Sequence, residues 1–195
     1  MRKIAIIGLE TNEGAEILNE LMAKDYVITA MAKDPFELPG SPLIIACDGQ
    51  INDVDVVAGH VKELENDVLI SGVHLGEEEN PEKALENLVE IAKKSAVKKL
   101  IFLGSTDEEK IDLDIQELMD KKLHGLDEKV LSWIHVSRSS KKLKGTEKQG
   151  YGIDVDGFEH TSSENHEALS HKNFAKAVVE LINQDEIHHQ KITIY

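Results

Sequence analysis

The sequence predicts an α/β protein with a mostly parallel, doubly wound sheet in one domain over residues 1–195. The first observation is that short apolar runs alternate with helix-patterned segments along the chain, as in βαβ units. The second is that several runs, such as KKLIFLGS (98–105), are apolar throughout, as expected of strands that helices cover on both faces. Length and composition suit a single core.

The expected strands are short runs rich in branched aliphatic residues. The segment at 41–48, SPLIIACD, is predicted to be a buried strand like the others. The final run, KITIY, would add a last strand to the sheet. The full set of expected strands is 3–8, 26–33, 41–48, 67–73, 98–105, 132–137 and 191–195.

The expected helices show apolar residues at helical spacing. The clearest lies at 82–97, where Glu82 stands near the start and Lys93 near the end, an order that complements the helix dipole. Its apolar stripe consists of Ala84, Leu85, Leu88, Ile91 and Ala92. The full set of expected helices is 15–25, 54–64, 82–97, 110–131 and 171–186.

The charge of the chain argues against two classes of partner. With 22 basic and 37 acidic residues, the net charge is −15, and such a field repels nucleic acid and anionic membrane surfaces.

No apolar run approaches the roughly 20 residues that span a bilayer. Cys47 is the one cysteine, which excludes an internal disulfide and fits a reducing compartment. We therefore expect a cytoplasmic protein.

Two kinds of site find no support. The chain has nine histidines, but the spacings of His160, His166 and His171 match no zinc pattern, so we expect no metal. No Gly-x-Ser-x-Gly sequence is present, which argues against a hydrolase.

The segment KIAIIGLETNEG (3–14) predicts a ligand site. A strand breaks at Gly8 into a turn, and a helix begins near Gly14. A helix start of this kind offers free backbone N–H groups to a phosphate, and glycines let the backbone approach it.

Four segments resemble the atypical short-chain dehydrogenase/reductase group, specifically its NmrA-like and NADH–flavin-reductase-like members. They are KIAIIG…NEGAEILNEL, VITAMAKDP, ENLVEIAKKSAVKKLIFLGS (86–105) and LSHKNFAKAVVELI…HHQKITIY. The resemblance covers about 1–105 and 169–195. It implies a Rossmann-like fold, an NAD(P) cofactor, and a substrate-side region over 106–168.

The resemblance also implies the residues of a cofactor site. Gly8, Thr11, Asn12 and Gly14 would carry the pyrophosphate, Lys33 a 2′-phosphate, and Asp48 the adenine side; the ribose would pass Ser71, Gly72 and Val73. Lysine in place of the acidic residue that ordinarily follows the second strand favours NADP over NAD. The other interpretations remain open: Lys33 as a solvated surface lysine, and Asp48 and Gly72 as ordinary turn residues.

The phosphate loop departs from the family pattern Gly-x-x-Gly-x-x-Gly. Thr11 stands at the middle glycine, where a Cβ would push the phosphate outward or forbid a positive φ. Glu10 and Glu13 bring carboxylates to the same loop. A carboxylate about 4 Å from a phosphate costs about 1 kcal/mol in water and about 4 kcal/mol at a dielectric near 20. Alternatively, both side chains point to solvent.

The catalytic residue that the resemblance implies is Ser105, at the position of the serine that polarises a carbonyl. Its usual Tyr-x-x-x-Lys partner is absent, because no lysine follows Tyr26, Tyr151 or Tyr195 at that spacing. Arg138 precedes a serine where the family often has Arg-Pro. A bound nicotinamide can supply hydride with little help beyond orientation.

Two functions follow as expectations. The first is an NADPH-dependent reductase that passes hydride to a flavin, quinone or similar small acceptor. The alternative is a non-catalytic NmrA-like binding or regulatory protein with a degraded cofactor loop, which kept the fold and lost the cofactor or the turnover. The expected cofactor is NADP, with NAD or no cofactor as the other outcomes. The sequence leaves the oligomeric state open.

Overall fold

A computed structural model describes residues 2–75, 78–104, 118, 122–123, 131–138, 151, 153–155 and 169–194. Ser105 lies outside these residues. Most of the helix expected over 110–131 and most of the substrate-side region 106–168 also lie outside them. The description below therefore concerns the sheet, the helices that cover it and the loops at its carboxyl edge.

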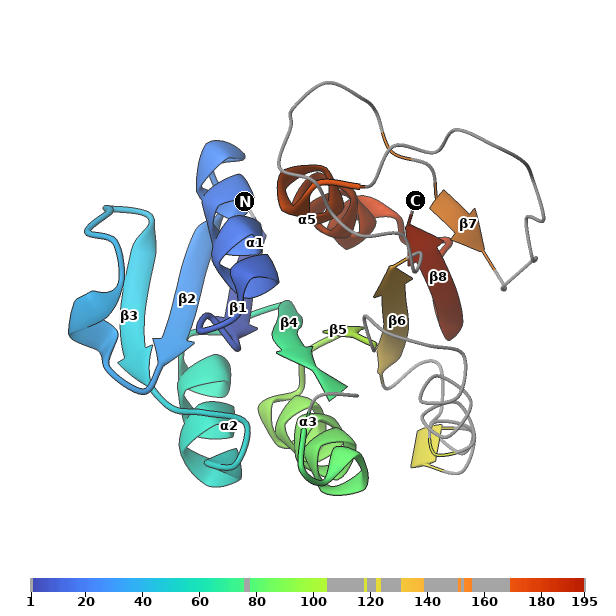
Figure 1. Cartoon of the computed structure of the whole chain (residues 1–195). Helices are drawn as coiled ribbons and strands as arrows, with labels where there is room; N and C mark the ends of the chain where they lie inside the picture. Colours follow the sequence, from blue (N-terminus) through green and yellow to red (C-terminus); the bar gives the residue numbers. More distant parts are fainter. Residues whose placement is uncertain are drawn as a thin grey trace.

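One eight-stranded sheet runs through the described part of the chain (Figure 1). Its order is β3-β2-β1-β4-β5-β6-β8-β7, and every neighbouring pair is parallel except β7 with β8. The strands are β1 Lys3–Ile7, β2 Val27–Ala32, β3 Ile44–Asp48, β4 Val68–His74, β5 Lys99–Leu103, β6 Ser132–Arg138, β7 Ile153–Val155 and β8 Gln190–Ile194. The predicted mostly parallel sheet is confirmed.

Helices cover both faces of the sheet, as predicted for a doubly wound fold. On one face lie α1 (Asn12–Ala23) and α5 (His171–Glu180), side by side; on the other lie α2 (Val54–Glu63) and α3 (Pro81–Ser95) (Figure 1). Two 3₁₀ turns, Pro35–Glu37 and Leu181–Asn183, complete the described helical segments. Each layer of helices closes its own apolar core against the sheet.

The structure corrects the prediction that 41–48 is a buried strand. β3 pairs only with β2 and forms one edge of the sheet. Ile45 is 41% exposed, because an edge strand beyond the helices is covered only in part. By contrast, the uninterrupted apolar strand β5 is buried at every position, as its sequence predicts.

The strand order creates a crevice between β1 and β4. From β1 the chain proceeds outward through β2 to β3, and from β4 it proceeds the other way through β5 to β6. The loops that leave these two central strands therefore diverge to opposite sides. In open α/β sheets, ligands bind in this crevice, at the carboxyl ends of the strands.

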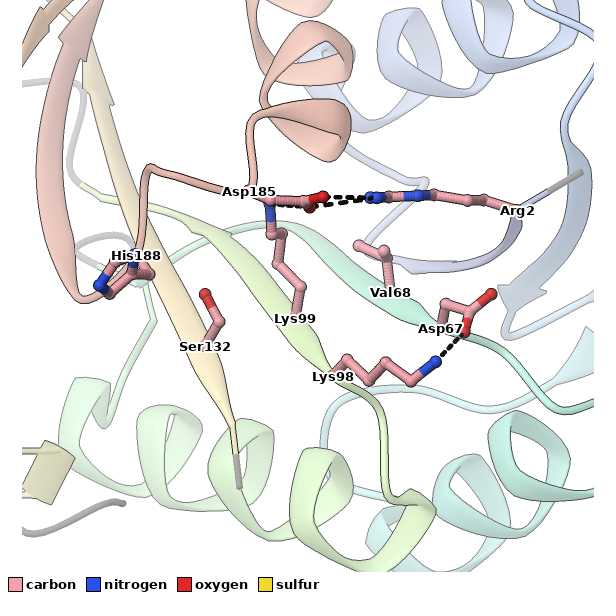
Figure 2. A pocket seen from close by; sticks show the side chains of 8 residues that line it. All are labelled: Arg2, Asp67, Val68, Lys98, Lys99, Ser132, Asp185 and His188. Carbon is pink, nitrogen blue, oxygen red and sulfur yellow. Dashed lines mark hydrogen bonds and ion pairs between the residues drawn. The ribbon is translucent and has the colours of Figure 1, made fainter. Parts of the chain in front are cut away.

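The amino edge of the sheet carries a pocket of about 570 Å³ whose charges are already paired (Figure 2). Arg2 binds Asp185, and Lys98 binds Asp67. The buried Lys99 amino group donates to the carbonyls of Leu181 at 3.2 Å and Gln184 at 2.9 Å. Lys99 therefore caps backbone carbonyls of the segment that follows α5. This capping indicates a structural role.

Replacing Lys99 with methionine is expected to destabilise the fold by about 3 kcal/mol, because hydrogen bonds from a charged group contribute about 1.5–3 kcal/mol and the buried carbonyls would lose their donor. Chemical denaturation measures the change. Lys98→Met is the matched control: Lys98 is 82% exposed, and a surface ion pair contributes about 1 kcal/mol or less. Equal losses in the two variants would contradict the capping role.

None of the helices in the described ranges is both long enough and apolar enough to cross a membrane.

Candidate functional site

Gly8 turns the chain sharply out of β1 at the crevice. Its φ is +74°, a conformation that favours glycine. A Cβ at this position would lie 2.5 Å from the backbone nitrogen of Val73 and 2.9 Å from the carbonyl carbon of Gly72. The β1–α1 turn therefore packs directly on the end of β4, and only glycine fits there.

Gly72 and Gly14 complete this close contact between backbones. A Cβ on Gly72 would lie 2.7 Å from both the Cα of Gly14 and the carbonyl oxygen of Gly8, and a Cβ on Gly14 would overlap the same oxygen. The three glycines thus bring the start of α1 onto the central strands. All three glycines are predicted residues of the cofactor site, although Gly72 is a weak signal in the sequence by itself.

Thr11 is the N-cap of α1 and does not obstruct the turn. Its Oγ1 accepts from the Gly14 N–H at 2.9 Å and lies 2.9 Å from the Gly72 carbonyl, to which it can donate. Its φ is −83°, so the position needs no glycine. The backbone here has no positive φ for a Cβ to forbid, and the side chain turns inward to cap the helix. This cap also explains why α1 begins at Asn12, three residues before the predicted start. The expected outward shift of a phosphate stays a prediction.

The remaining groups of the turn can receive a phosphate. The backbone N–H groups of Glu10, Thr11 and Asn12 have no acceptor within the described part of the chain. Asn12 is exposed in the first position of α1, and Glu10 is exposed in the turn. The free N–H groups and the helix dipole favour an anion here, whereas the Glu10 carboxylate opposes one.

Two further predicted residues lie at strand ends on the same edge. Lys33 follows β2 directly and is exposed. Asp48 ends β3, and its Oδ1 lies 3.2 Å from His60 Nε2. Both positions are open to a ligand that lies along the carboxyl ends of β1, β2 and β3.

The predicted ribose-side residues divide into two groups. Val73 is half-buried next to Gly8, at the crevice, whereas Ser71 is fully buried and its hydroxyl accepts from the Val73 N–H at 3.3 Å. Ser71 therefore supports the end of β4 from inside. Ser105, the predicted catalytic residue, lies outside the described residues.

The burial of Glu13 contradicts the interpretation that its carboxylate points to solvent. It is 6% exposed and lies inside the carboxyl edge. Its Oε1 accepts from Arg138 at 2.6 Å and lies 2.9 Å from His171 Nδ1, while Oε2 lies 3.2 Å from His74 Nε2. The four residues come from α1, β6, α5 and β4, and we name them the Glu13 cluster.

The Glu13 cluster holds its carboxylate ionised. Burial raises the pKa of Glu13, but the hydrogen bond and charge of His74, the backbone N–H of Glu13 and the charge of His171 lower it more, and the pKa falls to about 2. Glu13 also stands in the first turn of α1, where the dipole favours an anion. This charge is therefore neutralised within the fold and does not face the phosphate turn.

His74 lies between two acceptor groups. Its Nδ1 lies 3.0 Å from the carbonyl oxygen of Gly104, and its Nε2 lies 3.2 Å from Oε2 of Glu13. The buried ring therefore stands between the residue that follows β5 and the carboxylate of α1.

His135 adds a second buried imidazole on the other face of the sheet. It stacks on Phe102 with ring centroids 5.2 Å apart, and a side chain at Gly104 would overlap it. Neither ring nitrogen has a partner among the described residues. Burial lowers the pKa of His135 to about 3, so it stays neutral and fixes the end of β5 by packing.

Tyr151 and Trp133 both pack against other side chains. Tyr151 packs against the core that α1 and α5 cover, and burial together with a hydrogen bond to Glu180 raises the pKa of its hydroxyl. Trp133 stacks on His189 with ring centroids 5.5 Å apart. Both contacts indicate a structural role.

Sequence reasoning missed the Glu13 cluster as a unit. A usable signal existed, because His74 and Arg138 directly follow expected strands and His171 opens an expected helix. Strand ends and helix starts on one edge of a parallel sheet are where ligands bind. Only the folded chain brings the other three side chains to the Glu13 carboxylate.

Solved structures share this fold along nearly the whole chain. A Rossmann-fold NAD(P)-binding family protein from Shigella flexneri matches with a TM-score of 0.77 at 15% identity, covering 100% of this chain and 93% of its own. A candidate NADH-flavin reductase from Streptococcus pneumoniae matches with a TM-score of 0.74 at 14% identity, covering 100% and 99%. A wide-type short-chain dehydrogenase/reductase from Veillonella parvula, in complex with NADP, has a TM-score of 0.74 at 11% identity, covering 99% and 94%.

No protein-family model matches the sequence, and no curated protein matches it. At 11–15% identity, the three structures establish the fold. They bear out the resemblance for the fold: the chain has a Rossmann fold.

Proposed function

We propose that this protein binds an NAD(P) dinucleotide at the carboxyl edge of its sheet and acts as a reductase of the atypical short-chain type. The observation that carries the proposal is the contact of Gly8, Gly14 and Gly72, which places a capped helix start with free N–H groups over the crevice. A side chain on any of the three would close that approach.

Each residue has a defined part in the proposed binding. The N–H groups of Glu10, Thr11 and Asn12 receive the pyrophosphate, and Lys33 pairs with a 2′-phosphate. Asp48 lies toward the adenine side, and Val73 borders the ribose. When bound, the reduced nicotinamide supplies hydride to a flavin, quinone or similar planar acceptor. A cytoplasmic setting is part of this proposal, because the single thiol, Cys47, fits a reducing compartment.

A second candidate is a regulatory protein that binds the dinucleotide without turnover. The exposed Glu10 carboxylate in the phosphate turn favours it, since that charge weakens cofactor affinity. The sequence also lacks a Tyr-x-x-x-Lys pair.

Calorimetric titration with NADPH and NADH tests the proposal. We expect NADPH to bind more tightly, and Lys33→Ala to weaken NADPH about fivefold while leaving NADH unchanged, because an exposed ion pair contributes about 1 kcal/mol. Lys62→Ala, which removes an exposed lysine on α2, is the control. If neither dinucleotide binds at millimolar concentration, the reductase proposal fails; binding without turnover of any flavin or quinone favours the regulatory protein.

The phosphate turn itself gives a further expected result. Glu10→Thr should tighten NADPH binding about fivefold or more by removing the opposing charge. Thr11→Gly should not tighten it, because Thr11 already has an ordinary φ and caps α1. The same titrations measure both changes, and tighter binding by Thr11→Gly alone would contradict the inward-turned threonine.

A further inference from the structure

Arg138 has N–H donors that find no acceptor among the described residues. One terminal nitrogen donates to Glu13, whereas its Nε–H is buried and has no acceptor in the described ranges. A guanidinium presents five N–H donors in a planar fork suited to carboxylate or phosphate. Because a buried donor left unpaired costs about 1–3 kcal/mol, this arginine is suited to a second oxyanion.

The charges around Arg138 favour the same kind of ligand. Arg138 and His171 both face Oε1 of Glu13, the one carboxylate in the described part of the chain that ion-pairs with either. The Arg138 guanidinium is permanently charged. It stands at the ligand-binding edge of a chain whose net charge is −15, so it is a local exception to the overall field.

The position of the pair fits a ligand that extends beyond the phosphate turn. Arg138 ends β6 and His171 begins α5, on the far side of the crevice from Lys33 and Asp48. His171 is 36% exposed, so the pair reaches the surface there. The N-terminus of α5 adds its dipole to the attraction for an anion.

We propose that Arg138 and His171 bind an anionic group, a carboxylate or a phosphate, carried by the acceptor of the reductase. Glu13 acts as the positioning residue, because its carboxylate holds the guanidinium at the carboxyl edge. This inference rests on the proposed function, which it deepens by naming the acceptor class: a planar molecule with an attached oxyanion.

FMN and riboflavin make a matched pair of probes, because they share the ring and differ by one phosphate. We expect fluorescence titration of the full chain to give FMN an affinity at least about tenfold higher than that of riboflavin, as charged hydrogen bonds of about 1.5–3 kcal/mol imply. Arg138→Gln should remove the preference and leave riboflavin unchanged, whereas Lys62→Gln should keep it. Equal affinities for the two flavins in the wild type would overturn the proposal.

A conservative variant guards against loss of the fold. Arg138→Lys keeps the charge next to Glu13 but not the planar fork, so we expect it to melt near the wild type and to lose part of the FMN preference. Full preference retained in both Arg138 variants would overturn the proposal.

NADPH titration of the same variants identifies the source of the anion. If Arg138→Gln weakens NADPH and leaves the FMN preference intact, the oxyanion belongs to the dinucleotide and the proposal fails. If NADPH does not bind at all while the FMN preference depends on Arg138, the anion site stands and the proposed reductase fails.

Discussion

Gly72→Ala is expected to lower the melting temperature by about 6–12 °C and to weaken NADPH binding at least about tenfold. The new Cβ would lie 2.7 Å from the Cα of Gly14 and from the carbonyl oxygen of Gly8. Both contacts are backbone, so neither can move away as a side chain would. Overpacking typically costs about 1–3 kcal/mol, and contacts with backbone atoms place this variant at about 3 kcal/mol. Each kcal/mol shifts the melting temperature of a chain this size by about 2–4 °C.

Gly59→Ala is the matched control and should raise the melting temperature. Gly59 lies inside α2, and a Cβ there would meet nothing within 4 Å. Alanine in a helix interior is favoured over glycine by about 0.5–1 kcal/mol. A calorimetric melt therefore distinguishes the two glycines by direction. If Gly72→Ala melts and binds like the wild type, the close approach of α1 to β4 is wrong.

Glu13→Ala is expected to destabilise the fold by about 3–5 kcal/mol at neutral pH. Removing one partner of a buried ion pair leaves the other charge uncompensated, and here Arg138 and His74 both lose their carboxylate. Denaturant unfolding measures the loss. Glu16→Ala changes the same residue type on the same helix and should stay within about 0.5 kcal/mol, because Glu16 is half-buried and makes no ion pair with a residue that the structure describes.

The effect of Glu13→Ala should depend on pH in a defined direction. The pKa of Glu13 falls from 4.5 to about 2 in the folded protein, so the ionised carboxylate stabilises the fold fully above the unfolded pKa. That contribution, up to about 3 kcal/mol, is lost as pH falls from about 5 toward 2. Unfolding curves at about pH 7 and about pH 3 should therefore show the variant and the wild type converging in acid. A pH-independent difference would contradict the ionised Glu13.

Local patterns were enough to predict most of the fold. The apolar runs and helical stripes of 3–105 and 171–194 gave the strand and helix positions, because periodicity reports which faces are buried. The strand predicted at 41–48 is present as β3, but its predicted burial is wrong, because Ile45 is exposed. Apolar residues look the same in a central and an edge strand, and the place of a strand in the sheet depends on pairing between distant segments.

The candidate site was predictable only in part. Gly8 and Gly14 were recognisable because their spacing around a strand–helix turn has a local cause. The direction of Thr11 and the burial of Glu13 were not, since each depends on partners far along the chain: the carbonyl of Gly72 for one, Arg138 and His171 for the other.

The sequence by itself thus determined a doubly wound α/β fold with a glycine-rich turn at the end of its first strand. It did so because strand periodicity and glycine geometry act over a few residues. Only the tertiary structure decided what the acidic residues of that turn do. Glu10 lies in solvent beside the phosphate turn, whereas Glu13 turns inward to a half-buried arginine and two histidines. The physical reason is that a carboxylate is stable in the interior only where donors from other strands and helices converge on it.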